Sequence, residues 1–566
     1  MSFSLAIINA KRLWTGLTSH EPEINAIGIE GERITAIAGT KEILARCTEC
    51  TEIIDAHGQF VMPGFTDSHC HFLDGGLRLL SVQLRDVSSR EQFSQRVAEF
   101  VRNVPEGTWV IGGDWDHHNW GGLAPDKSWL DAVAPKHPVW LNRMDGHMAL
   151  ANSAALAIAG LSRDTEDVVG GEIGRYPNGE LTGLLKDNAM NLVIDHIPPR
   201  SQAVLDSAVD AAMDYVAARG ITCVHTMVTV DCADGLWPRK EILGQENFEP
   251  AYTELATYEK ARAENRLRTR IHAALPLNSV ALLKEHVDKY GRGDAWLKID
   301  SVKAMIDGSL GTHTAAMQED YDDTPGYRGY LLWDTSTLAS LIRQADAAGF
   351  QIKMHAIGDR GIHEMLDLFE QLIRTTTAWD RRLRCEHAQH FLPDDIARFA
   401  KLGIIASVQP SHLADDGRWA CSCIGFKRLK TSWPMRSLLD EGAVLALGSD
   451  WFVTPPHPLE GIHAAVTRQT IDGKHPEGLV PQECISMEEA LIGYTQGAAF
   501  AGGVENDFGT LEPGKFADIA ILDTDILSQP PSALLNTQVS LTMVGAKTVY
   551  DAGTLKRANR PEDRED

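Results

Sequence analysis

The chain has 566 residues, of which 43% are hydrophobic and 23% are charged. This composition is typical of a globular protein with a large core, and it excludes a mainly disordered chain. Acidic residues outnumber basic ones by 78 to 53, which gives a net charge of −25, so binding to nucleic acid or to an acidic membrane surface is not expected.

The start of the chain and the cysteine count both favour the cytoplasm. No basic segment precedes the short apolar stretch at residues 5–8, so a secretory signal is not expected. No apolar run approaches the length of about 18 residues that a membrane-spanning helix needs. The nine cysteines are few for this length and odd in number, which argues against a disulfide framework.

Short strand-like patterns stand at both ends of the chain. Three lie within residues 1–59, and three more lie within residues 508–555. Strand-rich ends that flank a larger domain can meet in space, so we expect these two segments to form one small β-sandwich. The six patterns cover residues 5–8, 26–29, 34–38, 518–522, 539–544 and 548–550.

Between these ends, strand-like and helix-like patterns alternate, which is typical of parallel βα units. Most of the apolar runs are separated by stretches with apolar residues at three- and four-residue spacing, such as 204–218 and 362–373. Eight strands with crossover helices predict an α/β fold, a TIM-like (β/α)8 barrel over residues 60–507, with a doubly wound open sheet as the alternative. The eight runs are 60–66, 221–228, 270–277, 302–306, 351–357, 383–388, 404–409 and 444–448.

Residues 72–200 lie between the first and second expected strands and are rich in Trp, Gly and His. A βα loop usually has about 2–6 residues, so this segment is far too long for a simple connection. We expect an inserted subdomain here. Trp115, in the cluster 114–120, is a candidate for lining a substrate pocket, with the core of the subdomain as the alternative interpretation.

The segment Asp67-Ser68-His69-Cys70-His71 directly follows the first expected barrel strand. Residues two apart in an extended backbone point the same way, so both imidazoles should enter the space at the C-terminal mouth of the barrel. Imidazole is the commonest metal ligand in proteins. A lone His-x-His is nevertheless weak support, because structural histidine pairs are common.

Further polar residues stand at the ends of other expected strands. His355, His387 and Asp450 each close one of them, and active sites of (β/α)8 barrels lie at these ends. Any one of these side chains could be a satisfied core group, but their convergence would demand a cation. We therefore predict a centre of one or two divalent metal ions, with Zn²⁺ the first candidate among Zn, Mn, Fe and Co.

Lys303 lies inside another expected strand. A buried lysine amine loses its proton readily. The neutral amine can take up CO2 to become a carbamate, whose two oxygens suit a bridge between two metals. An ordinary lysine paired with Asp307 and a Schiff-base lysine are the alternatives, and the residues alone leave all three open.

Taken together, these motifs resemble the amidohydrolase superfamily, and most closely its branch of N-substituted formamide deformylase-like enzymes. The similarity extends over nearly the whole chain, and residues 509–518 resemble the return into the β-sandwich of that superfamily. The other segments that carry the resemblance are 61–65, 67–71, 307–311, 355–359, 386–389 and 448–451.

The resemblance implies a metal-dependent hydrolase with its centre at the strand ends. The implied ligands are His69, His71, Lys303, His355, His387 and Asp450. By this resemblance the first two histidines bind one metal and the two later histidines bind a second. The lysine bridges both metals as a carbamate, and the aspartate is a weak ligand that moves the proton.

The expected activity is hydrolysis of a non-peptide carbon–nitrogen bond, in a linear amide or an N-formyl or N-acyl amine. A divalent metal lowers the pKa of bound water towards about 7 and polarises the scissile carbonyl, while Asp450 is placed to accept the proton. His147 and His313 are candidates for contacting the substrate and its oxyanion. The alternatives are hydrolysis of an ester, lactone or imine, deamination, decarboxylation, and a catalytically silent binding protein on this fold. The expected partner is a small-molecule substrate, and a homo-oligomer stays open.

Cys421 and Cys423 lie in a polar segment before the last expected strand. We interpret this segment as a loop with two ordinary thiols, with metal storage or pocket lining as the alternatives. Cys47 and Cys50 have redox spacing but lack the βα context of a redox motif, so plain thiols are expected there too.

Overall fold

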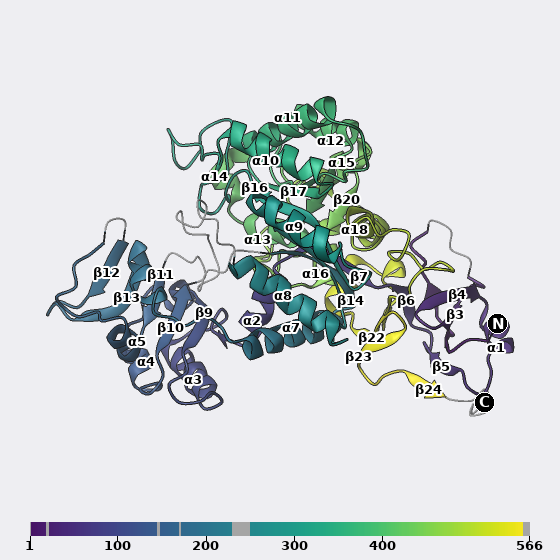
Figure 1. Ribbon diagram of the computed structural model, residues 1–566, viewed down its shortest axis with the longest axis horizontal. Helices are drawn as coiled ribbons and strands as arrows, with labels where there is room; N and C mark the ends of the chain where they lie inside the picture. The colour runs from purple at the N-terminus through teal and green to yellow at the C-terminus, as the bar shows by residue number, and fades with distance from the viewer. Residues whose placement is uncertain (1, 18–21, 144–147, 169–170, 229–248, 559–566) are drawn as a thin grey trace. The chain divides into compact units, whose positions relative to one another are not determined.

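The computed structural model describes residues 2–17, 22–143, 148–168, 171–228 and 249–558 (Figure 1). The chain divides into two compact units. The main unit comprises Met1–Phe72, Met213–Thr229 and Tyr258–Asp566, and the inserted unit comprises Leu73–Ala212 and Val230–Thr257. In the described part of the chain, every helix is too short or too polar to cross a membrane.

Eight parallel strands form the centre of the main unit (Figure 1). Backbone hydrogen bonds join its two edge strands: the N–H of Asp450 donates to the carbonyl of His69 at 2.7 Å, and the N–H of His71 donates to that of Trp451 at 2.5 Å. The predicted (β/α)8 barrel is therefore confirmed, and the open-sheet alternative is wrong. In spatial order the strands are β7 (Phe65–Cys70), β14 (Ile221–Met227), β15 (Arg270–Pro276), β16 (Leu297–Met305), β17 (Gln351–Ala356), β18 (Arg384–His387), β19 (Ile405–Val408) and β20 (Leu445–Leu447).

Amphipathic helices follow these strands, as the three- and four-residue spacing predicts. Helix α11 (Asp359–Thr375) buries one stripe that includes Ile362, Met365 and Phe369. Helix α12 (Ile396–Leu402) ends at Gly403, whose φ of 67° is left-handed and therefore favours glycine. The other helices that follow barrel strands include α9 (Val280–Tyr290), α10 (Thr335–Ala347), α13 (Pro410–Asp416) and α16 (Pro458–Thr467).

The first expected barrel strand, residues 60–66, is in fact two strands of different sheets. Strand β6 (Phe60–Pro63) pairs with a strand from the C-terminal end of the chain, and β7 begins at Phe65. The switch occurs at Gly64, whose N–H donates to the carbonyl of Asp518 at 2.9 Å. An added Cβ on Gly64 would stand 2.2 Å from Cγ2 of Thr222, so only glycine fits here. As a result, His69 lies inside the barrel strand.

Strands from both chain ends pack as two five-stranded sheets, drawn in purple and yellow in Figure 1. They enclose a core that includes Ile7, Ile54, Val61, Ile519 and Leu541. The sheets extend past the expected segments 1–59 and 508–555, because β6 and β24 also belong to them. The two orders are β24 (Lys556–Ala558), β5 (Glu52–Asp55), β1 (Leu5–Ile8), β3 (Ala26–Glu30), β4 (Arg33–Ala38), and β2 (Arg12–Leu13), β6, β21 (Ile519–Leu522), β22 (Val539–Val544), β23 (Lys547–Asp551).

The inserted unit has a six-stranded sheet of its own. Two separate hydrophobic clusters pack within it, one around Trp115 and Leu141 and the other around Trp140 and Leu185. Helix α3 (Arg90–Val101) contributes Phe93 and Val97 to the first cluster. The strand order is β12 (Gly171–Arg175), β13 (Leu181–Asp187), β11 (Met148–Ala151), β10 (Val139–Arg143), β9 (Val110–Trp115), β8 (Val82–Gln83).

Candidate metal centre

The six predicted ligands come from the C-terminal parts of five barrel strands. Because the strands are parallel, these parts share one end of the barrel. Five of the six side chains are buried or nearly so, and the His71 side chain remains 18% exposed. The positions are His69 in β7, His71 just after it, Lys303 in β16, His355 in β17, His387 at the end of β18 and Asp450 three residues after β20.

The structure brings these side chains together. One ligand atom each of His69, His387 and Asp450 lies within 4.8 Å of the others. Oδ1 of Asp450 is 3.4 Å from Nε2 of His69 and 3.3 Å from Nε2 of His71. Nζ of Lys303 is 3.5 Å from Nε2 of His69. Such a group can hold a cation at more than one point.

The ring of His355 joins the group through His387, since their ring centroids are 4.3 Å apart. Nε2 of His355 lies 3.2 Å from the carbonyl oxygen of Gly308. Both His387, with φ of 73°, and Asp450, with φ of 58°, have left-handed backbones that non-glycine residues rarely adopt. Uncommon backbone conformations of this kind concentrate at functional sites.

One member of the group escaped the sequence analysis. His412 lies on α13, and its Nε2 is 3.6 Å from Oδ2 of Asp450. Its ring is parallel to that of His387, with centroids 5.8 Å apart. The signal was present in the sequence, because His412 follows the expected strand 404–409 by three residues.

Several buried polar atoms in the group have no hydrogen-bond partner among the described residues. They include Nδ1 of His387, Nε2 of His412 and Oδ1 of Asp450. Burying a polar group without a partner costs about 1–3 kcal/mol, so a protein rarely leaves several together. Imidazole nitrogens and a carboxylate oxygen are the donor atoms that zinc-type cations bind. The residues therefore fit a divalent cation.

Three histidines of the group, His69, His355 and His387, are neutral, which is the form that binds metals. Burial lowers the pKa of His69 to about 4 and that of His355 to about 3, and the nearby Lys303 adds to both shifts. Burial also lowers the pKa of His387 well below its usual value. An uncharged imidazole keeps its lone pair free for a cation.

The surroundings also shift the pKa values of Asp450 and Lys303. Burial acts to raise the pKa of Asp450, but the close approach of His71 and His69 outweighs burial, so the net shift is downward. The residue is thus a carboxylate at neutral pH. Burial lowers the pKa of the Lys303 amine to about 8, which makes its neutral form accessible.

Lys303 does not use the partner that one alternative gave it. The carboxylate of Asp307 instead accepts hydrogen bonds from the backbone N–H groups of Ala316, Ile357 and Gly358, at 2.8–3.0 Å. These contacts fix the loop after β17. The interpretation of Lys303 as an ordinary ion pair with Asp307 is therefore wrong.

A buried carboxylate fixes the orientation of His69. Oε2 of Glu386 lies 2.6 Å from Nδ1 of His69, which leaves Nε2 to face the cluster. Arg384 holds Glu386 with two hydrogen bonds, at 2.7 and 3.0 Å. Such carboxylate–histidine pairs commonly orient metal ligands. The sequence analysis named Glu386 only as part of a motif and gave it no role.

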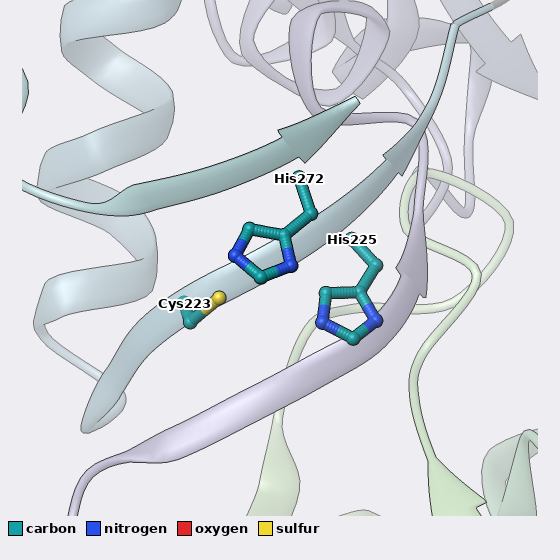
Figure 2. A group of neighbouring side chains, drawn as sticks. All are labelled: Cys223, His225 and His272. Atoms are coloured by element: carbon teal, nitrogen blue, oxygen red, sulfur yellow. The ribbon is translucent and has the colours of Figure 1, made fainter. Parts of the chain in front are cut away.

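A second buried group with metal-binding atoms lies on β14 and β15: Cys223, His225 and His272 (Figure 2). The two rings are stacked, with 7° between their planes and centroids 4.9 Å apart, so their lone pairs cannot point at one ion. Nδ1 of His225 lies 2.9 Å from Nη1 of Arg384 and accepts its hydrogen bond, which leaves the hydrogen on Nε2. Burial and nearby cations keep the pKa of both histidines well below the usual value. We interpret this group as a neutral pair that supports Arg384.

Two of the three predicted substrate residues, Trp115 and His313, are among the described residues. Trp115 is fully buried in the core of the inserted unit, and its indole N–H donates to the carbonyl of Leu141 at 2.8 Å. The structure thus corrects the pocket-lining expectation for Trp115 in favour of the core. His147 lies outside the described residues. His313 lies in the segment after β16, where its Nε2 is 2.9 Å from Oδ1 of Asp323.

Comparison with known proteins gives consistent results. The profile of the amidohydrolase family matches residues 52–550. The chain is 39% identical over 534 residues to Protein LONG AFTER FAR-RED 3 of Arabidopsis thaliana, covering 94% of this chain and 89% of that protein. It is 28% identical over 543 residues to N-substituted formamide deformylase of Arthrobacter pascens, covering 93% and 95% of the two chains.

Among solved structures, an uncharacterized metal-dependent hydrolase from Pyrococcus furiosus has a similar fold. The TM-score is 0.74 and the sequence identity is 27%. The similarity covers 93% of this chain and 100% of that chain. The likeness therefore includes the barrel, both terminal segments and the insertion.

Proposed function

Because the chain belongs to the amidohydrolase family and is therefore a hydrolytic enzyme, we propose that it cleaves a carbon–nitrogen bond other than a peptide bond. The substrate class that we propose is a small linear amide or an N-formyl or N-acyl amine. The observation that carries the proposal is the convergence of four histidines, one carboxylate and one buried amine at the C-terminal end of the barrel. The N-substituted formamide deformylase among its relatives supports this substrate class.

We assign the metal ligands as two pairs, with Zn²⁺ as the proposed ion. His69 and His71 would hold one ion, and His355 and His387 a second. Lys303, as a carbamate, would join them. A divalent cation bound there supplies Lewis acidity, which lowers the pKa of water and polarises a carbonyl group.

The side chain that moves the proton is Asp450. Its low pKa keeps it ionised at neutral pH, so it can accept a proton from the attacking water. The same carboxyl group then donates this proton to the nitrogen of the leaving amine. Nε2 of His412 lies 3.6 Å from the other carboxylate oxygen, Oδ2.

The state of Lys303 follows from its surroundings. With a pKa of about 8, part of the amine is neutral at neutral pH and can attack CO2, forming an N–C bond and releasing one proton. The carbamate carries a negative charge where a lysine ammonium would repel cations. The carbamate would supply anionic oxygen donors near His69, whose Nε2 lies 3.5 Å from Nζ.

The test combines elemental analysis with a substrate screen. We expect one to two divalent ions per chain and turnover of N-formyl or N-acyl amines that a chelator abolishes. Asp450→Asn should retain most of the metal and lose turnover, whereas His69→Ala should lose metal and turnover together. Full activity of metal-free protein would contradict the proposal. Turnover restricted to esters, lactones or imines would contradict the substrate class alone.

A further inference from the structure

A second set of metal-binding side chains lies outside the centre just described and shares no residue with it. One ligand atom each of His313, Asp323 and Cys423 lies within 4.8 Å of the others. Nε2 of His313 is 2.9 and 3.0 Å from the two carboxylate oxygens of Asp323. The thiol of Cys423 also hydrogen-bonds this carboxylate.

The three residues are brought together by tertiary structure. His313 and Asp323 stand in the long segment between β16 and α10, and Cys423 stands on α14 (Ala420–Leu429). The sequence analysis expected a polar loop at Cys423, and this expectation is wrong. The helix also turns Cys421 to an exposed position while burying Cys423.

The scaffold around the three side chains is held by several contacts. The N–H of Asp322 donates to the carbonyl of Cys423 at 2.8 Å, which fastens the segment to α14. Arg428 donates to Oδ1 of Asp322 at 2.7 Å. The ring of Tyr321 packs on the ring of His313, with centroids 4.6 Å apart. The ligand atoms are thus positioned before any ion binds.

We propose that His313, Asp323 and Cys423 form an additional binding site for a zinc-type divalent cation. Zinc bonds to imidazole nitrogen, carboxylate oxygen and thiolate sulfur are about 2.0–2.3 Å long, which puts tetrahedral ligands about 3.3–3.7 Å apart. The observed separations of 2.9 to at most 4.8 Å need only small side-chain movements to reach this geometry.

Binding exchanges one proton for one cation. Without a cation, the N–H of His313 and the S–H of Cys423 both point at the carboxylate of Asp323. On binding, the thiol loses its proton to solvent, and the imidazole moves its hydrogen to Nδ1. The sulfur, Nε2 and one carboxylate oxygen then bind the ion, so each cation releases one proton.

The electrostatic surroundings favour a cation here. Burial, together with Asp323, raises the pKa of the Cys423 thiol to about 12, so the thiol stays protonated until a thiophilic ion displaces the proton. Arg428, the nearby cation, is already bound by Asp322 and by the carbonyls of Glu319 and Asp320. The group of Cys223, by contrast, has parallel rings, and nearby cations add to the lowering of the pKa of its two histidines.

The site is open to solvent on one side. The side chains of His313 and Asp323 are 27% and 35% exposed, whereas Cys423 is buried. Three protein ligands and one open position describe an exchangeable site rather than a closed structural one. The occupancy of this site would therefore vary with the free concentration of the cation.

Cobalt spectroscopy distinguishes this site from the main centre, because only this site has a thiolate ligand. The full-length protein loaded with Co²⁺ should show a near-ultraviolet thiolate-to-cobalt charge-transfer band. Cys423→Ser should remove the band and about one cobalt per chain. Cys421→Ser, two residues away on the same helix, is the matched control and should keep both.

His313→Asn is the second variant, since a half-exposed side chain can be changed without disturbing the core. It should weaken cobalt binding that produces the band at least tenfold, while the thermal unfolding of the metal-free protein stays as in the wild type. A band that survives in Cys423→Ser, or wild-type cobalt protein without the band, would overturn the proposal. Neither outcome would contradict the proposed hydrolase activity, because the proposed metal ligands of the main centre are nitrogen and oxygen atoms.

Discussion

Burial and one or two neighbours together shift the pKa values of several side chains at the centre. Glu386 shows this most clearly. Burial acts to raise its pKa, but Arg384 and His69 together hold the pKa well below the usual value. Glu386 is thus a buried, ionised carboxylate, and it acts on His69, a proposed metal ligand, through the contact at Nδ1. Its role lies in orienting His69, since it has no place among the ligands.

We expect Glu386→Gln to reduce metal affinity by roughly 10–100-fold, the range usual when a carboxylate behind a ligating histidine is changed. The amide cannot supply the negative charge that fixes Nδ1 of His69 as the donor. Competition with a chromogenic chelator measures this affinity. Glu370→Gln is the matched control, because Glu370 pairs with Arg374 and Arg398 near the surface. Equal affinities in the two variants would contradict the orienting role.

A second prediction concerns His390, which lies outside the metal centre. Burial lowers its pKa to about 3, and its Nδ1 is 2.7 Å from Oγ of Ser432. In the unfolded chain the pKa is about 6.5, so between about pH 3 and 6.5 the unfolded state binds one more proton than the folded state. Stability from this residue is therefore complete above pH 6.5 and falls as the pH is lowered through this window.

Comparison with His390→Asn isolates this effect. The free energy of unfolding of the wild type minus that of the variant should rise by about 1.4 kcal/mol per pH unit across the window. Urea unfolding of metal-free protein at a series of pH values measures it. His57→Asn, at an exposed position, controls for removing a histidine as such and should run parallel to the wild type. A constant difference between wild type and His390→Asn would show that His390 protonates equally in both states.

At the scale of elements, the switch from sandwich to barrel at Gly64 invites a direct test. A Cβ on Gly64 would stand 2.2 and 2.4 Å from Cγ2 and Oγ1 of Thr222, so one of the two strands must shift. We expect Gly64→Ala to destabilise the protein by about 1–3 kcal/mol, as overpacked cores do. The midpoint of denaturant unfolding measures the loss.

Thr222→Ala removes both atoms that the new methyl group would meet. In the double variant, Gly64→Ala should therefore cost much less than it does in the wild-type background. Such a non-additive result is what a direct contact produces. If the losses of unfolding free energy were strictly additive, glycine would be required at position 64 by its backbone conformation and not by contact with Thr222.

The segment 60–66 also shows which features of the fold could be predicted from the sequence and which could not. Residues 60–65 are apolar and residues 60–66 are all buried, so hydrophobicity could not mark where one sheet ends and the next begins. Only the turn residues Pro63 and Gly64 indicated the boundary between the two strands. The strand-end rule, in contrast, singled out His355, His387 and Asp450 beside the His69-x-His71 motif, since it depends on local pattern and on parallel topology. Lys303 drew attention from inside a strand. His412 also obeys the rule, three residues after the expected strand 404–409, but was not singled out.

What the sequence could not provide is contact between distant segments. Asp323 and Cys423 are 100 residues apart, and no periodicity connects them to His313. The pairing of Glu386 with His69 likewise spans 317 residues. Trp115 could equally line a pocket or fill a core by pattern alone, and only the packing around its indole decides between them.

At the scale of the whole molecule, the metal centre joins strands that are far apart in the chain. The six proposed ligands lie on β7, β16, β17 and β18 and at positions shortly after β7 and β20, so the barrel must be closed for them to meet. A ligand that binds only the folded state stabilises it by mass action, by about 4 kcal/mol when its free concentration is a thousand times its dissociation constant. The barrel should therefore melt at a higher temperature with metal than without it.

We expect chelation to lower the melting temperature of the barrel by several degrees, and added Zn²⁺ to restore it in a concentration-dependent way. Scanning calorimetry measures both. The experiment is best done in the Cys423→Ser background, where a shift cannot come from the site at His313 and Asp323. In His69→Ala the shift should shrink sharply, because one ion loses a ligand. Two results would contradict this account: a melting temperature that does not change with metal, or a shift in His69→Ala as large as in the parent protein. Either would mean that the clustered side chains do not bind the ion that stabilises the barrel.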